Sequence, residues 1–170
     1  MYSVQEIKSN IYWVGGSDRR LALFENLFPL PNGVAYNSYL ILDEKTALLD
    51  TVDRSISQQY FENIAHVLGD RQLDYLIVNH MEPDHCSAIA EVLTRWPSVQ
   101  LICSKTAEPM IMQFFGFELS SHGRNVQEGD QLVTGRHTLV FVMAPMVHWP
   151  ESMMTYDATD KVLFSADAFG

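Results

Sequence analysis

Residues 73–85 read LDYLIVNHMEPDH, and this stretch decides both the fold class and the candidate site. Its first half, LDYLIV, is a nearly continuous apolar run, which is typical of a strand buried on both faces of a sheet. The run leads directly into four ionisable side chains, those of His80, Glu82, Asp84 and His85. Because sites in α/β proteins form at the ends of strands, the sequence predicts a functional site in this loop.

The loop offers a mixed set of nitrogen and oxygen ligands, two imidazoles and two carboxylates. Pro83 fixes one backbone angle and removes one N–H donor, so we expect a stiff loop that aims its side chains. Such a set suits iron, manganese or zinc, whereas the thiolates that favour softer metals are absent from it. The pattern therefore indicates a metal site in preference to a solvated acidic turn.

Two further ligand-type residues follow other predicted strands. His148 lies in APMVHWP at residues 144–150, and Asp167 lies in FSADAF at residues 164–169. Three strand ends that carry such side chains indicate one shared site for one or two metal ions. In a site with two ions, Asp167 is the natural bridge because a carboxylate has two oxygens. The candidate ligands are His80, Glu82, Asp84, His85, His148 and Asp167.

The rest of the chain alternates apolar runs with helical stripes, which predicts one continuous α/β layered domain. Strands are expected at residues 11–14, 36–42, 46–52, 73–78, 99–103, 137–144, 153–156 and 161–165, and helices at 56–68, 87–96 and 106–115. His137 and residues 157–160 are expected in polar, solvated turns outside the site.

The composition excludes some classes of partner. The 170 residues include 11 Lys and Arg against 21 Asp and Glu, a formal net charge of −10. This acidity argues against binding to nucleic acid and to an anionic membrane. The sequence shows neither a signal peptide nor an apolar run of about 20 residues that could span a membrane. With two isolated cysteines, Cys86 and Cys103, it indicates a protein of the reducing cytoplasm.

Three motifs together resemble the flavodiiron proteins: HxExDH at residues 80–85, PMxHWP at 145–150 and LFSxDAFG at 163–170. The similarity extends to LFENLFPLP at residues 23–31 and to residues 33–52. It implies a metallo-β-lactamase-like αββα sandwich with a non-haem diiron site that reduces O2 to water or NO to N2O. Electrons would come from FMN in a flavodoxin-like domain.

The resemblance also implies a ligand set. His80, Glu82 and His148 would hold one iron, Asp84 and His85 the other, and Asp167 would bridge them. Hydrolases of the same superfold generally carry a histidine where this chain has Glu82. A hard carboxylate at this position favours iron over zinc.

The resemblance also implies that residues 1–170 are the N-terminal part of the domain, with the FMN domain outside this chain. We therefore expect an incomplete, inactive fragment that leaves a sheet face with Leu139, Phe141 and Leu163 uncovered. Such a face predicts a homo-oligomer. The expected partners are O2 or NO as substrate and rubredoxin or a similar protein as electron donor.

Two alternatives stay open at this point. One is a zinc-dependent hydrolase of the same superfold, in which a metal-bound hydroxide is the nucleophile. The other is a non-catalytic truncated module that binds metal weakly and depends on another chain.

Overall fold

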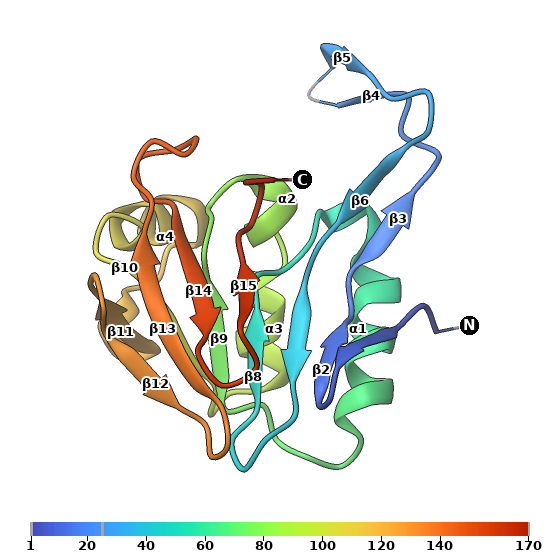
Figure 1. The fold of residues 1–170 in the computed structure, drawn as a ribbon. Helices are drawn as coiled ribbons and strands as arrows, with labels where there is room; N and C mark the ends of the chain where they lie inside the picture. Colours follow the sequence, from blue (N-terminus) through green and yellow to red (C-terminus); the bar gives the residue numbers. More distant parts are fainter. Residues whose placement is uncertain (1, 25, 170) are drawn as a thin grey trace.

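The protein is described here by a computed structural model that covers residues 2–24 and 26–169 (Figure 1). Glu25 and Gly170, which belong to two of the stretches similar to flavodiiron proteins, lie outside the described residues. Within the described ranges, seven strands form the larger sheet. Their order is β1 (Gln5–Lys8), β2 (Ile11–Trp13), β7 (Tyr39–Ile41), β8 (Ala47–Leu49), β9 (Tyr75–Val78), β10 (Gln100–Ser104) and β11 (Gly123–Val126).

The strand predicted from LDYLIV is β9, near the centre of this sheet. It pairs in parallel with β8 and with β10. Leu76 and Val78 pack toward the helices, whereas Ile77 packs toward the second sheet. Burial on both faces explains the continuous apolar pattern, so the prediction for this strand is confirmed.

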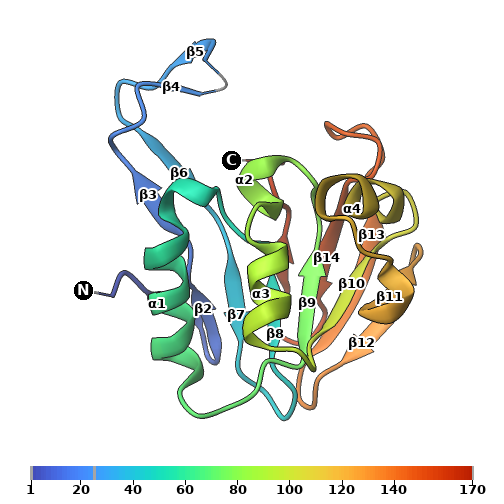
Figure 2. The ribbon, with the colours of Figure 1, turned by 180° about the vertical axis from the view of Figure 1, so that it is seen from behind.

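Helices α1 (Ser57–Leu68) and α3 (Ile89–Arg95) cover one face of the larger sheet (Figure 2). The spacing of Ile56, Tyr60, Ile64 and Val67 predicts an apolar stripe; the structure buries the first three and leaves Val67 half-buried, with Leu68 buried beside it. The other helical segments are η1 (Arg54–Ile56), α2 (Pro83–Cys86), α4 (Glu108–Phe115) and η2 (Leu119–Ser121). In the described part of the chain, no helix is long and apolar enough to cross a membrane.

A second, antiparallel sheet lies against the opposite face of the larger one (Figure 1). Its inner side chains form a core with those of the larger sheet, which gives a helix–sheet–sheet arrangement. Strands β4 (Leu23–Phe24) and β5 (Phe28–Pro29) form a two-stranded hairpin that extends from this body. The hairpin lies beyond the strand pair β3 (Gly16–Asp18) and β6 (Val34–Tyr36). The second sheet contains β12 (Gln131–Val133), β13 (Thr138–Met143), β14 (Met153–Asp157) and β15 (Val162–Phe164).

One expectation about the second sheet was wrong. Leu139 and Phe141 do not lie on an uncovered face; both are fully buried between the two sheets. Leu163 is 45% exposed. It pairs with Tyr156, and Tyr156 pairs with Val140, so Leu163 lies in line with Val140 and not with Leu139. Alternate residues of a strand point to opposite faces, so Leu163 shares the outer face with Val140.

A second correction concerns the turn residues. His137 and Asp157 are fully buried, and Nδ1 of His137 lies 2.7 Å from Oδ2 of Asp157. The prediction that His137 and Asp157 lie in solvated turns is therefore wrong. The reason is tertiary, since the β12–β13 turn packs against the β7–β8 turn through Asp43.

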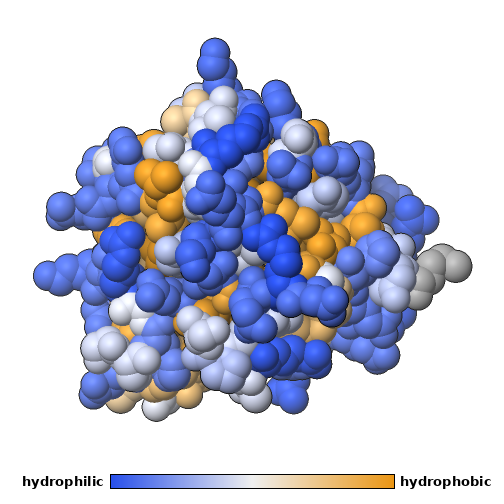
Figure 3. Space-filling model, turned by 90° about the horizontal axis from the view of Figure 1, so that it is seen from below, coloured by the Kyte–Doolittle hydropathy of each residue, from blue (hydrophilic) through white to orange (hydrophobic). Residues whose placement is uncertain are grey.

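Asp43 holds these two turns together. Its Oδ2 accepts hydrogen bonds from the backbone N–H of His137 and the hydroxyl of Thr134, both at 2.8 Å. Burial acts to raise the pKa of Asp43, but the accepted hydrogen bonds outweigh it and lower the pKa to about 2. The turns lie at the end of the molecule seen in Figure 3, where hydrophilic side chains surround smaller apolar areas.

Replacing Asp43 tests this contribution. Because the folded pKa is below the ordinary value of an aspartate, the ionised form of Asp43 stabilises the fold above that value, and this stabilisation decreases as the pH falls toward 2. Asp43→Asn should lower the free energy of unfolding by about 1–2 kcal/mol at pH 7. The deficit should shrink at pH 3, as measured by urea unfolding with the exposed Asp70→Asn as control. A deficit of the same size at both pH values would contradict the assignment.

Candidate metal centre

The site forms directly after β9, where the buried strand ends. His80 is 1% exposed, and Glu82 is 6% exposed. The chain then enters the short helix α2, which begins at Pro83. Proline is favoured at the first position of a helix because no N–H is needed there. The second half of the motif therefore sits on a helical turn, which the sequence analysis did not predict, and this turn carries Asp84 and His85.

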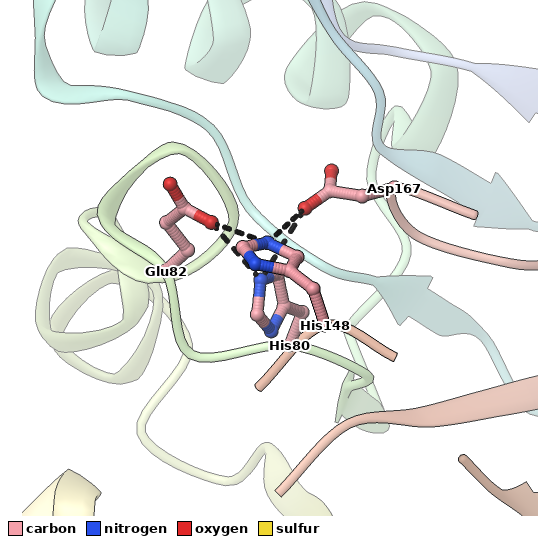
Figure 4. A group of neighbouring side chains, drawn as sticks. All are labelled: His80, Glu82, His148 and Asp167. Atoms are coloured by element: carbon pink, nitrogen blue, oxygen red, sulfur yellow. Dashed lines mark hydrogen bonds and ion pairs between the residues drawn. The ribbon is translucent and has the colours of Figure 1, made fainter. Parts of the chain in front are cut away.

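The first group of side chains is drawn in Figure 4. Nε2 of His80 lies 3.2 Å from Oε2 of Glu82 and 3.3 Å from Oδ2 of Asp167. Nε2 of His148 lies 2.9 Å and 3.3 Å from the same two oxygens. The four ligand atoms all lie within 4.8 Å of one another, a separation that one metal ion can span.

A second group adjoins the first through Asp167. Its other oxygen, Oδ1, lies 2.5 Å from Nε2 of His85, and that nitrogen lies 3.6 Å from Oδ2 of Asp84. One oxygen of Asp167 thus faces each group, which is the geometry of a bridging carboxylate. The structure brings all six residues singled out in the sequence together, in two groups that share Asp167.

Charge interactions perturb the site strongly. Burial, together with the charges of Asp167 and Glu82, raises the pKa of Asp84 to about 6 in spite of His85. Burial acts to raise the pKa of Asp167 as well, but hydrogen bonds from His80 and His85 hold it well below its usual range. Carboxylates crowded in this way repel one another, and a bound cation would relieve that repulsion.

The histidines respond in the opposite sense. Burial acts to lower the pKa of His80, but hydrogen bonds with Asp167 and Glu151 outweigh it and raise the pKa to about 10. The same kind of balance raises the pKa of His85, where burial is outweighed by the hydrogen bond with Asp167 together with the charges of Asp50, Asp84 and Asp167. Protons on these imidazoles neutralise the carboxylates, and metal ions would replace those protons.

Unsatisfied polar atoms also fit a metal. Oδ1 of Asp84 is buried and has no hydrogen-bond partner within the described residues. A buried polar atom without a partner is costly, and a cation would supply the missing interaction. The donor set of imidazole nitrogens and carboxylate oxygens suits iron, manganese or zinc. The residues therefore fit two metal ions.

Two buried carboxylates beside the ligands were missed in the sequence analysis. Asp50 follows β8, and its oxygens accept the backbone N–H of Asn79 at 2.6 Å and the side-chain amide of Asn79 at 3.1 Å. Glu151 lies beside His80, at 2.8 Å. Each lies far from the HxExDH motif in the sequence, and no local pattern marks either one.

The aromatic neighbours differ in their roles. The ring of Trp149 packs edge-on against that of His80, with centroids 5.4 Å apart. Phe169 is 91% exposed and does not close the site. Trp149 therefore walls the site beside His80, whereas Phe169 does not.

The fold and this arrangement of strand-end histidines and carboxylates define a metallo-β-lactamase-like domain. The chain belongs to the ODP family of beta lactamases, whose family model matches residues 34–170. The predictions of a metallo-β-lactamase-like fold and of flavodiiron kinship are confirmed by this match and by the relatives described next.

Several known proteins are similar over nearly the whole chain. The anaerobic nitric oxide reductase flavorubredoxin of Vibrio vulnificus (strain YJ016) is 40% identical over 166 residues, which are 96% of this chain and 33% of that protein. The crystal structure of the flavodiiron protein from Giardia intestinalis superposes with a TM-score of 0.93 at 30% identity, covering 100% of this chain and 41% of that one. Rubredoxin oxygen:oxidoreductase from Desulfovibrio gigas gives a TM-score of 0.89 at 30% identity, covering 95% and 40%. The chain thus spans about a third of the length of the curated relatives it matches.

Removing one ligand tests the metal centre. Glu82→Ala should lower the affinity for Fe²⁺ at least about tenfold, because even changes to groups behind the ligands cost about 10–100-fold. Anaerobic titration calorimetry and metal analysis measure this. The matched control is Glu91→Ala, whose exposed carboxylate pairs with Arg95 at 2.6 Å. Iron binding in Glu82→Ala equal to that of the wild type would remove Glu82 from the ligand set.

Proposed function

We propose that the domain binds two iron ions. His80, Glu82 and His148 hold one ion, Asp84 and His85 hold the other, and Asp167 bridges them. The observation that carries this proposal is the division of the six side chains into two groups that share Asp167. Iron is favoured over zinc because three of the six ligands are hard carboxylates and none is a thiolate.

The proposed reaction is the reduction of O2 to water or of NO to N2O. Two bound iron ions would supply the redox chemistry, with electrons from FMN held by a flavodoxin-like domain outside these residues. The names of the relatives support this, since one is a nitric oxide reductase flavorubredoxin and another a rubredoxin oxygen:oxidoreductase. Rubredoxin or a similar protein is the proposed electron donor.

Access to the site supports a small, apolar substrate. His80 and His85 are buried and fix the inner side of the site, whereas the His148 side chain is 56% exposed and that of Asp167 is 35% exposed. A cleft leads to Asp84 and Asp167 and is lined mainly by apolar side chains, those of Phe24, Phe28, Leu30, Val34 and Ala166. Such a lining favours a diatomic gas over a polar substrate.

The same cleft argues against hydrolysis of an anionic substrate. Two clefts reach Asp84, and no Lys or Arg among the described residues lines either of them. An anionic ester would meet carboxylates there without a compensating cation from the chain. The zinc-dependent hydrolase is therefore the second candidate, supported by the superfold alone.

Metal content and gas consumption test this function in the full protein that contains the chain. We expect about two iron ions per chain and consumption of NO or O2 when reduced rubredoxin is supplied. Metal analysis, Mössbauer spectroscopy and a gas electrode make these measurements. Zinc in the isolated protein, with cleavage of ester or phosphoester substrates and no gas consumption, would replace the proposal with the hydrolase.

Residues 1–170 alone should show negligible reductase activity, even with iron and reduced rubredoxin. The proposed relay through FMN lies outside these residues, so electrons reach the site slowly. The control is the full protein, assayed at equal iron content. Turnover by the isolated chain at an ordinary enzymatic rate, about 1–10³ per second, would show that no relay is required.

Two other expectations stay predictions. A homo-oligomer is supported by the outer face of the second sheet, where Val133 is 59% exposed and Leu163 is 45% exposed. A cytoplasmic location rests on the sequence features alone.

A further inference from the structure

A buried carboxylate behind the first group of ligands has no part in the proposed ligand set. Glu151 lies three positions after His148, and its side chain is fully buried. Its Oε1 lies 2.8 Å from Nδ1 of His80 and also accepts the backbone N–H of Met81 at 2.8 Å. Glu151 thus contacts His80, the first residue of the motif. The contact is on the side of the His80 ring that faces away from the other ligands.

This contact determines which nitrogen of His80 faces the metal. A neutral imidazole carries one N–H and one bare nitrogen. A carboxylate only accepts, so Nδ1 of His80 must be the nitrogen that carries hydrogen. A bound metal ion would take the place of hydrogen on Nε2, the atom that lies 3.2 Å from Oε2 of Glu82 and 3.3 Å from Oδ2 of Asp167.

Glu151 is held from two other segments, one at its carboxylate and one at its backbone carbonyl. The Met81 N–H fixes Oε1, and the hydroxyl of Ser104, at the end of β10, donates to the backbone carbonyl of Glu151 at 2.8 Å. The nearest competing group is the hydroxyl of Ser152, which lies 3.4 Å from Nδ1 of His80. A hydroxyl can donate or accept, so Ser152 alone would not fix the tautomer.

Burial of Glu151 is difficult to explain by stability alone. Its second oxygen, Oε2, is buried and has no hydrogen-bond partner within the described residues. Burying a carboxylate with one unsatisfied oxygen is unfavourable. A carboxylate behind a metal-bound histidine, in contrast, orients the ring and increases its strength as a ligand.

We propose that Glu151 is a positioning residue that holds His80 with hydrogen on Nδ1, so that Nε2 binds the metal ion of the first group. This inference rests on the proposed metal centre. Glu151 touches neither the ion nor the substrate, and it acts through His80.

Two substitutions of Glu151 test this role in the full protein. Glu151→Leu removes the acceptor, whereas Glu151→Gln keeps an acceptor oxygen in nearly the same shape. The matched control is Glu128→Gln, because Glu128 also accepts a backbone N–H, that of Met143 at 2.6 Å, but lies on an exposed surface. Circular dichroism and thermal melting establish that each variant is folded.

The first measurement is the affinity for Co²⁺, determined by competition with a chelator. Glu151→Leu should weaken binding to the first group about 10–100-fold. Glu151→Gln should weaken it less, and Glu128→Gln should leave it unchanged. If Glu151→Leu does not fold, the comparison of the two Gln variants replaces it. Weaker Co²⁺ binding in Glu151→Gln, with unchanged binding in Glu128→Gln, would then support the positioning role.

The second measurement is the tautomer of His80 in the Zn²⁺-loaded protein, where one ring nitrogen binds the ion and the other carries hydrogen, from two-bond ¹H–¹⁵N couplings in ¹⁵N-histidine-labelled samples. Wild type and Glu151→Gln should carry hydrogen on Nδ1, whereas Glu151→Leu should show a mixture of tautomers. Affinity within twofold of wild type in folded Glu151 variants would overturn the inference. Weaker binding with an unchanged tautomer in Glu151→Leu would also overturn it, because packing would then explain the loss.

The two proposals fail in distinguishable ways. A wild-type protein that does not bind two metal ions would overturn the proposed function together with this inference. Two ions in the wild type, with unaltered affinity in the Glu151 variants, would overturn the positioning role alone.

Discussion

The carboxylate of Asp167 joins the two halves of the candidate site, and the arrangement of the other ligands depends on it. One oxygen lies 3.3 Å from the ring nitrogens of both His80 and His148, and the other lies 2.5 Å from that of His85. Asp167 follows β15, the edge strand of the second sheet. Its position therefore depends on the packing of that sheet against the larger one, through buried residues such as Phe141 and Ile77.

Crowding of negative charge is the second constraint on this region. Burial is the largest cause that raises the pKa of Asp84 to about 6, and the nearby charges of Asp167 and Glu82 raise it further. Among the described residues, protonated His80 and His85 partly neutralise these carboxylates. Metal ions bound at the proposed centre would displace those protons, so metal binding, protonation and the stability of the folded domain would be coupled.

Rigid support comes from buried polar contacts between elements far apart in the chain. Asp50 fixes Asn79 at the end of β9, and Glu151 contacts His80 from 71 positions away. These contacts fix the directions of the candidate ligands, which would lower the cost of forming a metal site. The exposed side chain of His148 leaves the opposite side accessible to a small molecule.

The sequence by itself determined the central strand, the helices that cover it and the six residues at the strand ends, because each depends on a local apolar period or a short motif. Only the tertiary structure decided which alternate residues of β13 and β15 face inward, so that Phe141 is buried and Leu163 is exposed. It also decided the burial of His137 against Asp157 and the contact of Glu151 with His80. An alternating pattern specifies the two faces of a strand, but it does not specify which face meets a partner sheet. Buried polar pairs form between residues that are distant in the chain, so no local pattern connects them.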